Sequence, residues 1–257
     1  MKTKADIVNN WLPRYTGMPL ENFEPYILLV NFSHYVDVFA QKFGVEIFGK
    51  GLSMQCASAE NITIINFGMG SANAATIMDL LMAVMPKACL FLGKCGGLKQ
   101  GKNNVGDLIL PIAAIRGEGT SNDYFPVEVP ALPAFALQKA TSTTIRDYAK
   151  DYWTGTVYTT NRRVWEFDTD FKDYLSRIRA LAIDMETATL FSVGFHNAIP
   201  TGALLLVSDM PMVPEGVKTS HSDVMVTNSF TPTHLDIGID SLRQLIHDKL
   251  TVKHLKF

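Results

Sequence analysis

The chain has 257 residues, of which 47% are hydrophobic and 19% charged, and its net charge is −2. These totals are typical of a globular protein and exclude a disordered chain, and they show no basic surface for nucleic acid. The length allows one large domain or two small ones, and the lack of a linker, repeat or low-complexity segment favours one domain over residues 1–257.

The first part of the chain predicts a short helix followed by alternating strands and helices. A buried strand is expected at residues 26–32, and the helix after it is expected to begin with Ser33 as its cap and to end at Gly44. Two strands about a tight turn come next. The next helix is expected to begin at Ser71 and to end before Pro86. Its apolar face has helical spacing and comprises Ala74, Ile77, Met78, Leu81, Met82 and Met85.

The rest of the chain continues this alternation. Further strands are expected at residues 88–92, 107–115, 152–161, 180–184 and 201–209. Further helices are expected at residues 131–150, 186–197 and 234–250. Because the strands are continuous apolar runs, helices must cover both faces of their sheet. The sequence therefore predicts an α/β fold, a three-layer αβα sandwich with a mixed, largely parallel central sheet.

Several observations concern the compartment. No apolar run approaches the roughly 20 residues that span a bilayer, and the N-terminal residues lack the apolar core of a secretion signal. The chain has three cysteines, which are Cys56, Cys89 and Cys95. Their odd number and their lack of paired spacing favour reduced thiols. A cytoplasmic protein without a membrane partner is therefore expected.

Two glycine-rich segments follow predicted strands, where α/β proteins collect their sites. In "GMGSAN" the third glycine of a dinucleotide fingerprint is absent at Asn73, so the segment is either a tight turn or an anion site at a helix start. In "GKCGG" the P-loop pattern fails, because Cys95 follows Lys94 where serine or threonine is required. Gly96 is expected to allow a ligand to approach the backbone.

Acidic residues end two other strands. Asp184 and Glu186 follow one, and Asp209 follows another beside Ser208. Asp184 is expected to cap the next helix, while carboxylates from two strand ends can divide acid and charge-stabilising roles in one cleft. The histidines and cysteines lack metal-binding spacing and no Gly-x-Ser-x-Gly elbow is present, so neither a metal nor a cofactor is expected.

The strings "GMGSANA", "GKCGGL", "RGEGTS", "TTN", "DMETAT" and "VSD", in this order, resemble the nucleoside phosphorylase and nucleosidase superfamily. The likeness covers nearly the whole chain and implies a nucleoside phosphorylase-like fold. Longer strings, such as "LGKCGGL" and "TGTVYTTNRRVWE", resemble the branch that hydrolyses AMP to adenine and ribose 5-phosphate. Larger members of that branch carry a further N-terminal domain, so a short form is expected.

The resemblance implies that Asp209, oriented by Ser208, protonates the purine, and that Glu186 holds the ribose with Met185 packed beneath it. The phosphate-binding residues of the phosphorylases fall near Asn31, Tyr35 and Phe91 and are lost here. Water is therefore the expected nucleophile, with His34 or Tyr35 as candidates to position it. A 5′-phosphate would need cations or helix N–H groups. The candidates are Lys94, Arg116, Arg162, Arg163 and Lys218.

The remaining expectations concern substrate contacts and assembly. Gly70 and Asn161 belong to the matching strings and are expected near the substrate, whereas Trp165 is either an adenine-stacking residue or a core residue. Residues 212–223 are expected to form a lid. The expected partner is a small-molecule purine nucleotide. A homo-oligomer built from dimers is expected, and a hexamer is one form that it can take. Residues 34–50 are expected to complete the site of a neighbouring subunit.

Three alternatives remain open. A methylthioadenosine or adenosylhomocysteine nucleosidase would need an apolar tail site, against which the basic candidates argue. A purine nucleoside phosphorylase would need the missing phosphate-binding residues. A non-catalytic nucleotide-binding protein with a Rossmann-like sheet would not require an acidic residue beside the purine base.

Overall fold

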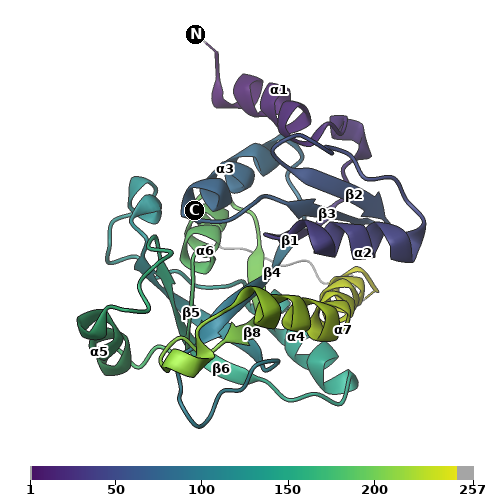
Figure 1. The fold of residues 1–257 in the computed structure, drawn as a ribbon. Helices are drawn as coiled ribbons and strands as arrows, with labels where there is room; N and C mark the ends of the chain where they lie inside the picture. Colours follow the sequence, from purple (N-terminus) through teal and green to yellow (C-terminus); the bar gives the residue numbers. More distant parts are fainter. Residues whose placement is uncertain (1, 248–257) are drawn as a thin grey trace.

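The computed structural model describes residues 2–247, which fold around an eight-stranded mixed sheet (Figure 1). The strands are β1 (Tyr26–Val30), β2 (Gln55–Ala59), β3 (Ile62–Asn66), β4 (Ala88–Gly97), β5 (Leu108–Gly117), β6 (Trp153–Thr160), β7 (Ala182–Asp184) and β8 (Thr201–Asp209). Their order in the sheet is β2-β3-β1-β4-β7-β6-β5-β8, with an additional pairing between β4 and β8. Most neighbouring pairs are parallel, as expected, and the antiparallel ones are β2–β3, β4–β7 and β5–β8.

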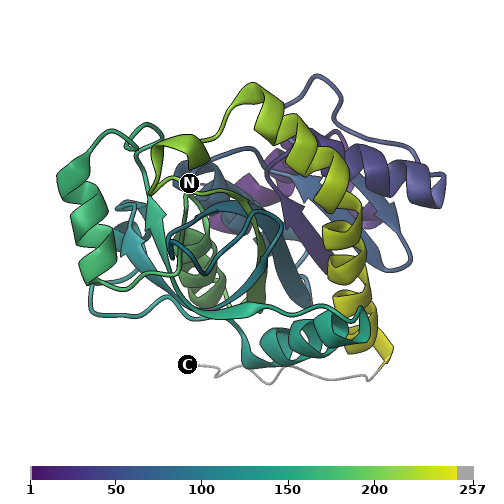
Figure 2. The same ribbon diagram turned by 60° about the horizontal axis from the view of Figure 1, so that its bottom comes forward.

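Helices cover both faces of the sheet. They are α1 (Lys4–Thr16), α2 (Ser33–Phe43), α3 (Ser71–Leu80), α4 (Phe135–Asp147), α5 (Thr169–Arg177), α6 (Thr187–His196) and α7 (Ser220–His247). One apolar core joins the sheet to α1, α3 and α6, and a second joins it to α2, α4 and α7. Figure 2 shows α7 as a long helix that runs beside α4. The predicted three-layer αβα arrangement is therefore confirmed.

The second half of the sheet curls into a closed ring. β8 pairs with β5 on one side and with β4 on the other, so the five strands β4, β7, β6, β5 and β8 return to their starting point. The parallel strands β1, β4 and β8 end at the same edge, because Val30 pairs with Leu92 and Lys94 pairs with Leu206. This edge brings residues that are distant in sequence to one place.

Two helix caps differ from the prediction. Phe32, not Ser33, is the capping residue of α2, and its side chain makes no capping hydrogen bond. Gly70 occupies the cap of α3, because the Ser71 hydroxyl instead donates to the Met185 carbonyl at 2.6 Å. The predicted end at Gly44 is confirmed, since this glycine adopts the left-handed conformation that ends helices.

Several boundaries also differ. β4 continues through the "GKCGG" segment to Gly97, so this glycine-rich string is buried strand and not a loop. The apolar face of α3 ends early, and Met85 is exposed beyond it. α5 was not predicted, and α7 begins at Ser220, well before the predicted start at His234. The predicted end of that last helix, at residue 250, lies outside the described residues.

Other sequence expectations can be compared with residues 2–247. Cys56, Cys89 and Cys95 are buried and form no disulfide. No helix in this part of the chain combines the length and apolar character that crossing a membrane requires.

Candidate active site

A pocket of about 560 Å³, including its open mouth, lies at the shared edge of β1, β4 and β8. It holds acids and cations from segments that lie far apart in the chain. Its lining includes Asn31, Phe32, Met69, Lys94, Cys95, Gly96, Thr160, Arg162, Arg163, Trp165, Glu166, Asp184, Met185, Glu186, Ser208, Asp209, Pro211 and Lys218. The size suits a drug-sized or nucleotide-sized ligand. Nine of the thirteen candidate site residues therefore meet in one place.

Glu186 is the most deeply buried acid of the pocket, with 2% of its surface exposed. Its Oε1 accepts a hydrogen bond from the Gly70 N–H at 2.7 Å, and its Oε2 accepts one from the Met185 N–H at 3.3 Å. Burial, and next the charge of Asp184, raise the pKa of Glu186 to about 8. Gly70 thus contributes by orienting Glu186, and it does not line the pocket itself.

Asp184 supports the start of α6 as predicted, but the cap position of this helix is Glu186 and not Asp184. Its Oδ2 accepts from the Thr187 N–H at 2.8 Å, at the first residue of α6, and also from the Thr187 hydroxyl. Its Oδ1 accepts from the Thr159 hydroxyl at 2.7 Å. Burial raises the pKa of Asp184, although these hydrogen bonds oppose the shift. The carboxylate fixes the start of α6 and so the position of Glu186.

The burial of Glu186 predicts a stability change in Glu186→Gln. Because the folded pKa of about 8 exceeds the ordinary value of 4.5, folding resists ionisation of this group between those two pH values. The wild type therefore loses stability as pH rises from 4.5 to about 8. We expect Glu186→Gln to be more stable by about 3 kcal/mol at pH 7 and nearly unchanged near pH 4.5. Urea unfolding of both proteins at the two pH values measures this, and an equal difference at both would contradict it.

Asp209 ends β8 and also lines the pocket. The Ser208 hydroxyl donates to its Oδ1 at 2.6 Å and also lies 3.3 Å from the Cys95 carbonyl oxygen. Burial raises the pKa of Asp209, while Lys218, with its Nζ 3.7 Å from Oδ1, opposes the shift. A carboxyl group whose pKa is raised toward neutrality is suited to act as a general acid.

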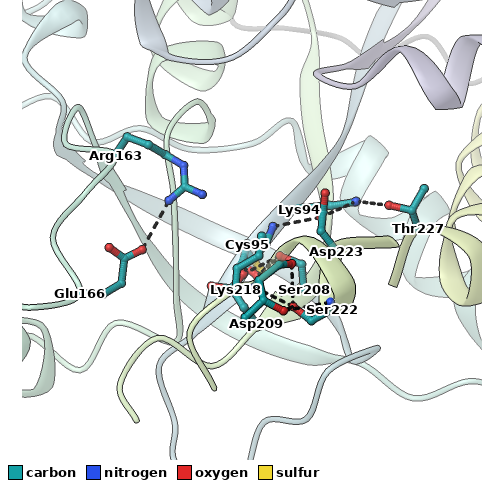
Figure 3. A network of polar contacts seen from close by, with 11 residues as sticks. Lys94, Cys95, Arg163, Glu166, Ser208, Asp209, Lys218, Ser222, Asp223 and Thr227 are labelled. Carbon is teal, nitrogen blue, oxygen red and sulfur yellow. Dashed lines mark hydrogen bonds and ion pairs between the residues drawn. The ribbon is translucent and has the colours of Figure 1, made fainter. Parts of the chain in front are cut away.

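A network of charged groups adjoins Asp209 (Figure 3). Lys94 Nζ donates to the Thr227 hydroxyl at 2.7 Å and to Asp223 Oδ1 at 3.2 Å. Lys218 Nζ lies 3.5 Å from the same Asp223 oxygen. Only 3% of the Lys94 side chain is exposed, and burial lowers its pKa. The two lysines therefore share Asp223, and Lys218 also pairs with Asp209, so this corner of the pocket has a net positive charge when Asp209 is protonated.

The two arginines of the pocket are paired individually. Arg162 Nη2 donates to Asp168 Oδ2 at 2.8 Å, and Arg163 Nη1 donates to Glu166 Oε1 at 3.4 Å. About half of each side chain is exposed. Figure 3 shows the Arg163–Glu166 pair apart from the lysine network. These pairs carry no net charge, so they attract an anion less than the two lysines do.

Four expected site residues do not line the pocket. Arg116 lies away from it, because its guanidinium donates to the Phe125 and Val129 carbonyl oxygens at 2.7 and 2.8 Å and to other groups of that loop. His34 lies in the first turn of α2, and Asn161 is exposed beyond the end of β6. The fourth is Gly70, described above. Arg116 therefore holds a loop together and does not contact the pocket.

Two further expectations change. Tyr35 points into the core, where its hydroxyl lies 2.8 Å from His234 Nδ1, so it is not placed to position water. Gly96 does line the pocket, but the space of its missing side chain faces Pro211, whose Cγ would lie 2.7 Å from an added Cβ. Gly96 therefore allows a protein segment, rather than a ligand, to pack closely.

Sequence reasoning missed several residues of the site. Asn31 was noted only as the position of a lost phosphate binder, and Phe32, Asp223 and Thr227 were not considered. Asn31 directly follows a buried strand, which was an available signal. The contacts of Thr227 depend on the early start of α7, which the sequence did not indicate. Within residues 2–247, no group of three histidine, cysteine, aspartate or glutamate side chains is placed to bind a metal.

Comparison with known proteins adds independent information. The model of the phosphorylase superfamily matches residues 25–229. A crystal structure of AMP nucleosidase from Bacteroides thetaiotaomicron is 59% identical, with a TM-score of 0.86 over 96% of this chain and 99% of that chain. A crystal structure of uridine phosphorylase from Vibrio fischeri, 20% identical with a TM-score of 0.78, shares the fold over 88% of this chain and 94% of its own.

AMP nucleosidase from Escherichia coli strain K12 is a more distant relative in sequence. It is 28% identical over 90% of this chain. The chain spans only 57% of the length of that relative.

Proposed function

Because the chain belongs to the phosphorylase superfamily, as its motifs predict, we propose that it is an N-glycosidase that hydrolyses AMP to adenine and ribose 5-phosphate. The two AMP nucleosidases that it resembles support this substrate. The observation that carries the proposal is that Asp209 and Glu186, from the ends of different strands, line one pocket together with Lys94 and Lys218.

The proposed reaction assigns one role to each acid. Protonated Asp209 gives its proton to N7 of adenine, so the base leaves as a neutral molecule with the electron pair of the N9–C1′ bond. Glu186 accepts hydrogen bonds from the ribose hydroxyls. In its ionised form, which a pKa of about 8 makes the minor form at pH 7, its charge stabilises the positive charge that develops on the sugar ring. The oxygen of water bonds to C1′ and water loses a proton, which gives ribose 5-phosphate.

We assign the 5′-phosphate to Lys94 and Lys218. Both line the pocket and share Asp223, and the other partner of Lys218 is Asp209, the acid that is protonated in the proposed reaction, whereas each arginine has a carboxylate of its own. An incoming dianion therefore gains most beside the lysines. Asp223 projects from the first turn of α7 and is partly exposed, so it can turn to solvent when phosphate takes its place.

This assignment predicts a change in substrate affinity. We expect Lys94→Met to raise the KM for AMP by about 10- to 100-fold, because a charged hydrogen bond contributes about 1.5–3 kcal/mol. The KM for adenosine, which has no phosphate, should hardly change. Lys42→Met is the matched control, since Lys42 pairs with Asp236 outside the pocket. Equal effects of Lys94→Met on both substrates would contradict a phosphate contact.

A substrate panel tests the proposed activity against its alternatives. Adenine release is measured from AMP, adenosine, methylthioadenosine and adenosylhomocysteine at equal concentrations. The proposal predicts the highest kcat/KM for AMP. A preference for methylthioadenosine or adenosylhomocysteine would indicate the alternative nucleosidase, and a lack of cleavage with retained AMP binding would indicate a binding protein.

We also propose that the enzyme works in the cytoplasm as a homo-oligomer built from dimers. The three unpaired, buried cysteines support a reducing compartment. Exposed apolar side chains, including Val164 and Phe167 beside the pocket residues Arg163 and Glu166, support an interface there. Light scattering of the purified chain measures the assembly, and a monomer at micromolar concentration would contradict it.

A further inference from the structure

Given the proposed hydrolysis, on which this inference rests, we propose that Asn31 positions the attacking water. Its side-chain oxygen Oδ1 accepts a hydrogen bond from that water, while its amide group contacts Glu186. Asn31 would thus be a positioning residue that connects the nucleophile to the acid at the sugar.

The first observation is a buried acceptor without a partner. Only 8% of Asn31 is exposed, and its Oδ1 is fully buried yet accepts no hydrogen bond from any group in residues 2–247. A buried polar atom left unpaired costs about 1–3 kcal/mol, so such atoms are uncommon away from binding sites. Because Asn31 lines the pocket, a bound molecule can supply the missing donor.

The second observation is the orientation of the side chain. Asn31 contributes a hydrogen bond to Glu186 that lowers the pKa of that acid. Only Nδ2 of an asparagine side chain can donate, so Oδ1 is the atom left for another molecule. The side chain is therefore held from one side by Glu186 and offers an acceptor on the other.

The third observation is what surrounds this acceptor. Asn31 follows β1, whose last residue Val30 pairs with Leu92, two residues before Lys94 on β4. The next residue, Phe32, has its ring centre 4.7 Å from Lys94 Nζ. Asn31 is thus beside the acid assigned to the sugar, and its neighbour Phe32 packs against the lysine assigned to the phosphate. A molecule held by Asn31 is therefore next to the acid that we assign to the ribose.

The step balances with the residues present. The water oxygen forms a bond to C1′ while the N9–C1′ bond breaks and its electron pair leaves with adenine, which takes a proton from Asp209. The amide of Asn31 cannot accept a proton. The proton lost by water therefore passes to Glu186, which acts in its ionised form and which Asn31 contacts through its amide group.

A sugar hydroxyl is the competing occupant of Oδ1, and product ratios distinguish it from water. Wild type, Asn31→Ala and Asn103→Ala are incubated with AMP in buffer containing methanol, and ribose 5-phosphate and its methyl glycoside are quantified. The control is matched because Asn103 is 4% exposed and also has an unpaired amide atom, but does not line the pocket. A product ratio does not depend on the fraction of enzyme that is folded.

We expect Asn31→Ala to raise the share of methyl glycoside, because water loses its positioning contact and the truncation admits the larger nucleophile, whereas Asn103→Ala keeps the wild-type ratio. We also expect kcat to fall about 100-fold with little change in KM, as for a misplaced reactant. The same fold loss with 2′-deoxy-AMP and 3′-deoxy-AMP would support a water contact.

An unchanged product ratio in Asn31→Ala, or a loss that vanishes with one of the deoxy substrates, would overturn the proposal in favour of a sugar contact or of no contact. If the wild type released no adenine from AMP, the proposed function would fail instead. The two failures are therefore distinguishable.

Discussion

Asp209→Asn is expected to lower kcat for AMP by about 1000-fold while AMP still binds, since a positioned general acid contributes roughly 10²- to 10⁴-fold. Asparagine keeps the shape of the side chain and can still interact with the Ser208 hydroxyl, 2.6 Å from Oδ1 in the wild type. It has no carboxyl proton for N7 of adenine. Single-turnover kinetics and equilibrium binding of AMP measure the two quantities separately.

The matched control is Asp151→Asn, since Asp151 is 84% exposed and pairs with Arg146 outside the pocket. This variant should keep the wild-type kcat. If Asp209→Asn retained more than a tenth of the wild-type kcat, Asp209 would not be the proton donor, although it could still contact the base.

Glu186→Gln is the second change with a large expected effect, a fall in kcat of about 100- to 1000-fold. The carboxylate is aimed by the Gly70 and Met185 N–H groups. Glutamine can still contact the ribose, but it has no charge to stabilise the developing cation and cannot take the proton from water. Steady-state kinetics with AMP at pH 8, where a carboxyl group with a pKa of about 8 is half ionised, measures the loss.

The stability of the same variant serves as its control. Glu186→Gln is expected to unfold at higher urea concentration than the wild type at pH 7, because the buried carboxylate resists ionisation. A variant that is more stable and less active cannot owe its lost activity to unfolding. A kcat within tenfold of the wild type would remove Glu186 from the mechanism.

The layers and most strands could be predicted because each is a local pattern. Continuous apolar runs such as residues 88–92 indicate strands covered on both faces, and this pattern held. The closure of five strands into a ring could not be predicted, since the pairing of β4 with β8 depends on the curvature of the whole sheet. One helix, α5, was missed entirely. For α5 a signal was present in Asp168, whose side chain accepts from the Phe171 N–H as an N-cap.

The start of α7 was missed for a different reason. Pro232 lies inside this helix, and a proline normally ends or kinks a helix because it lacks an N–H. From the sequence, residues 212–223 were expected to form a lid loop, and no element was predicted for residues 224–233. The structure continues the helix back to Ser220, which places Asp223 and Thr227 against Lys94. The positive corner of the pocket was consequently not visible from sequence.

The candidate site was predicted in part because strand ends in an α/β sheet converge. This rule and the family resemblance brought Glu186, Asp209 and Lys94 together correctly in one pocket. Neither could tell Lys94 from Arg116, since both are single cations near strand ends. The two cations differ in the contacts that they make in the folded chain. The guanidinium of Arg116 donates to carbonyl oxygens of the loop that follows it.

Product identification with and without inorganic phosphate tests most directly whether water is the nucleophile. AMP is incubated with the purified chain in phosphate-free buffer, and adenine and the sugar product are quantified over time. We predict equal amounts of adenine and ribose 5-phosphate, at a rate that does not require phosphate. Adenine release that depends on added phosphate, with a sugar 1-phosphate as the product, would contradict hydrolysis and show a phosphorylase.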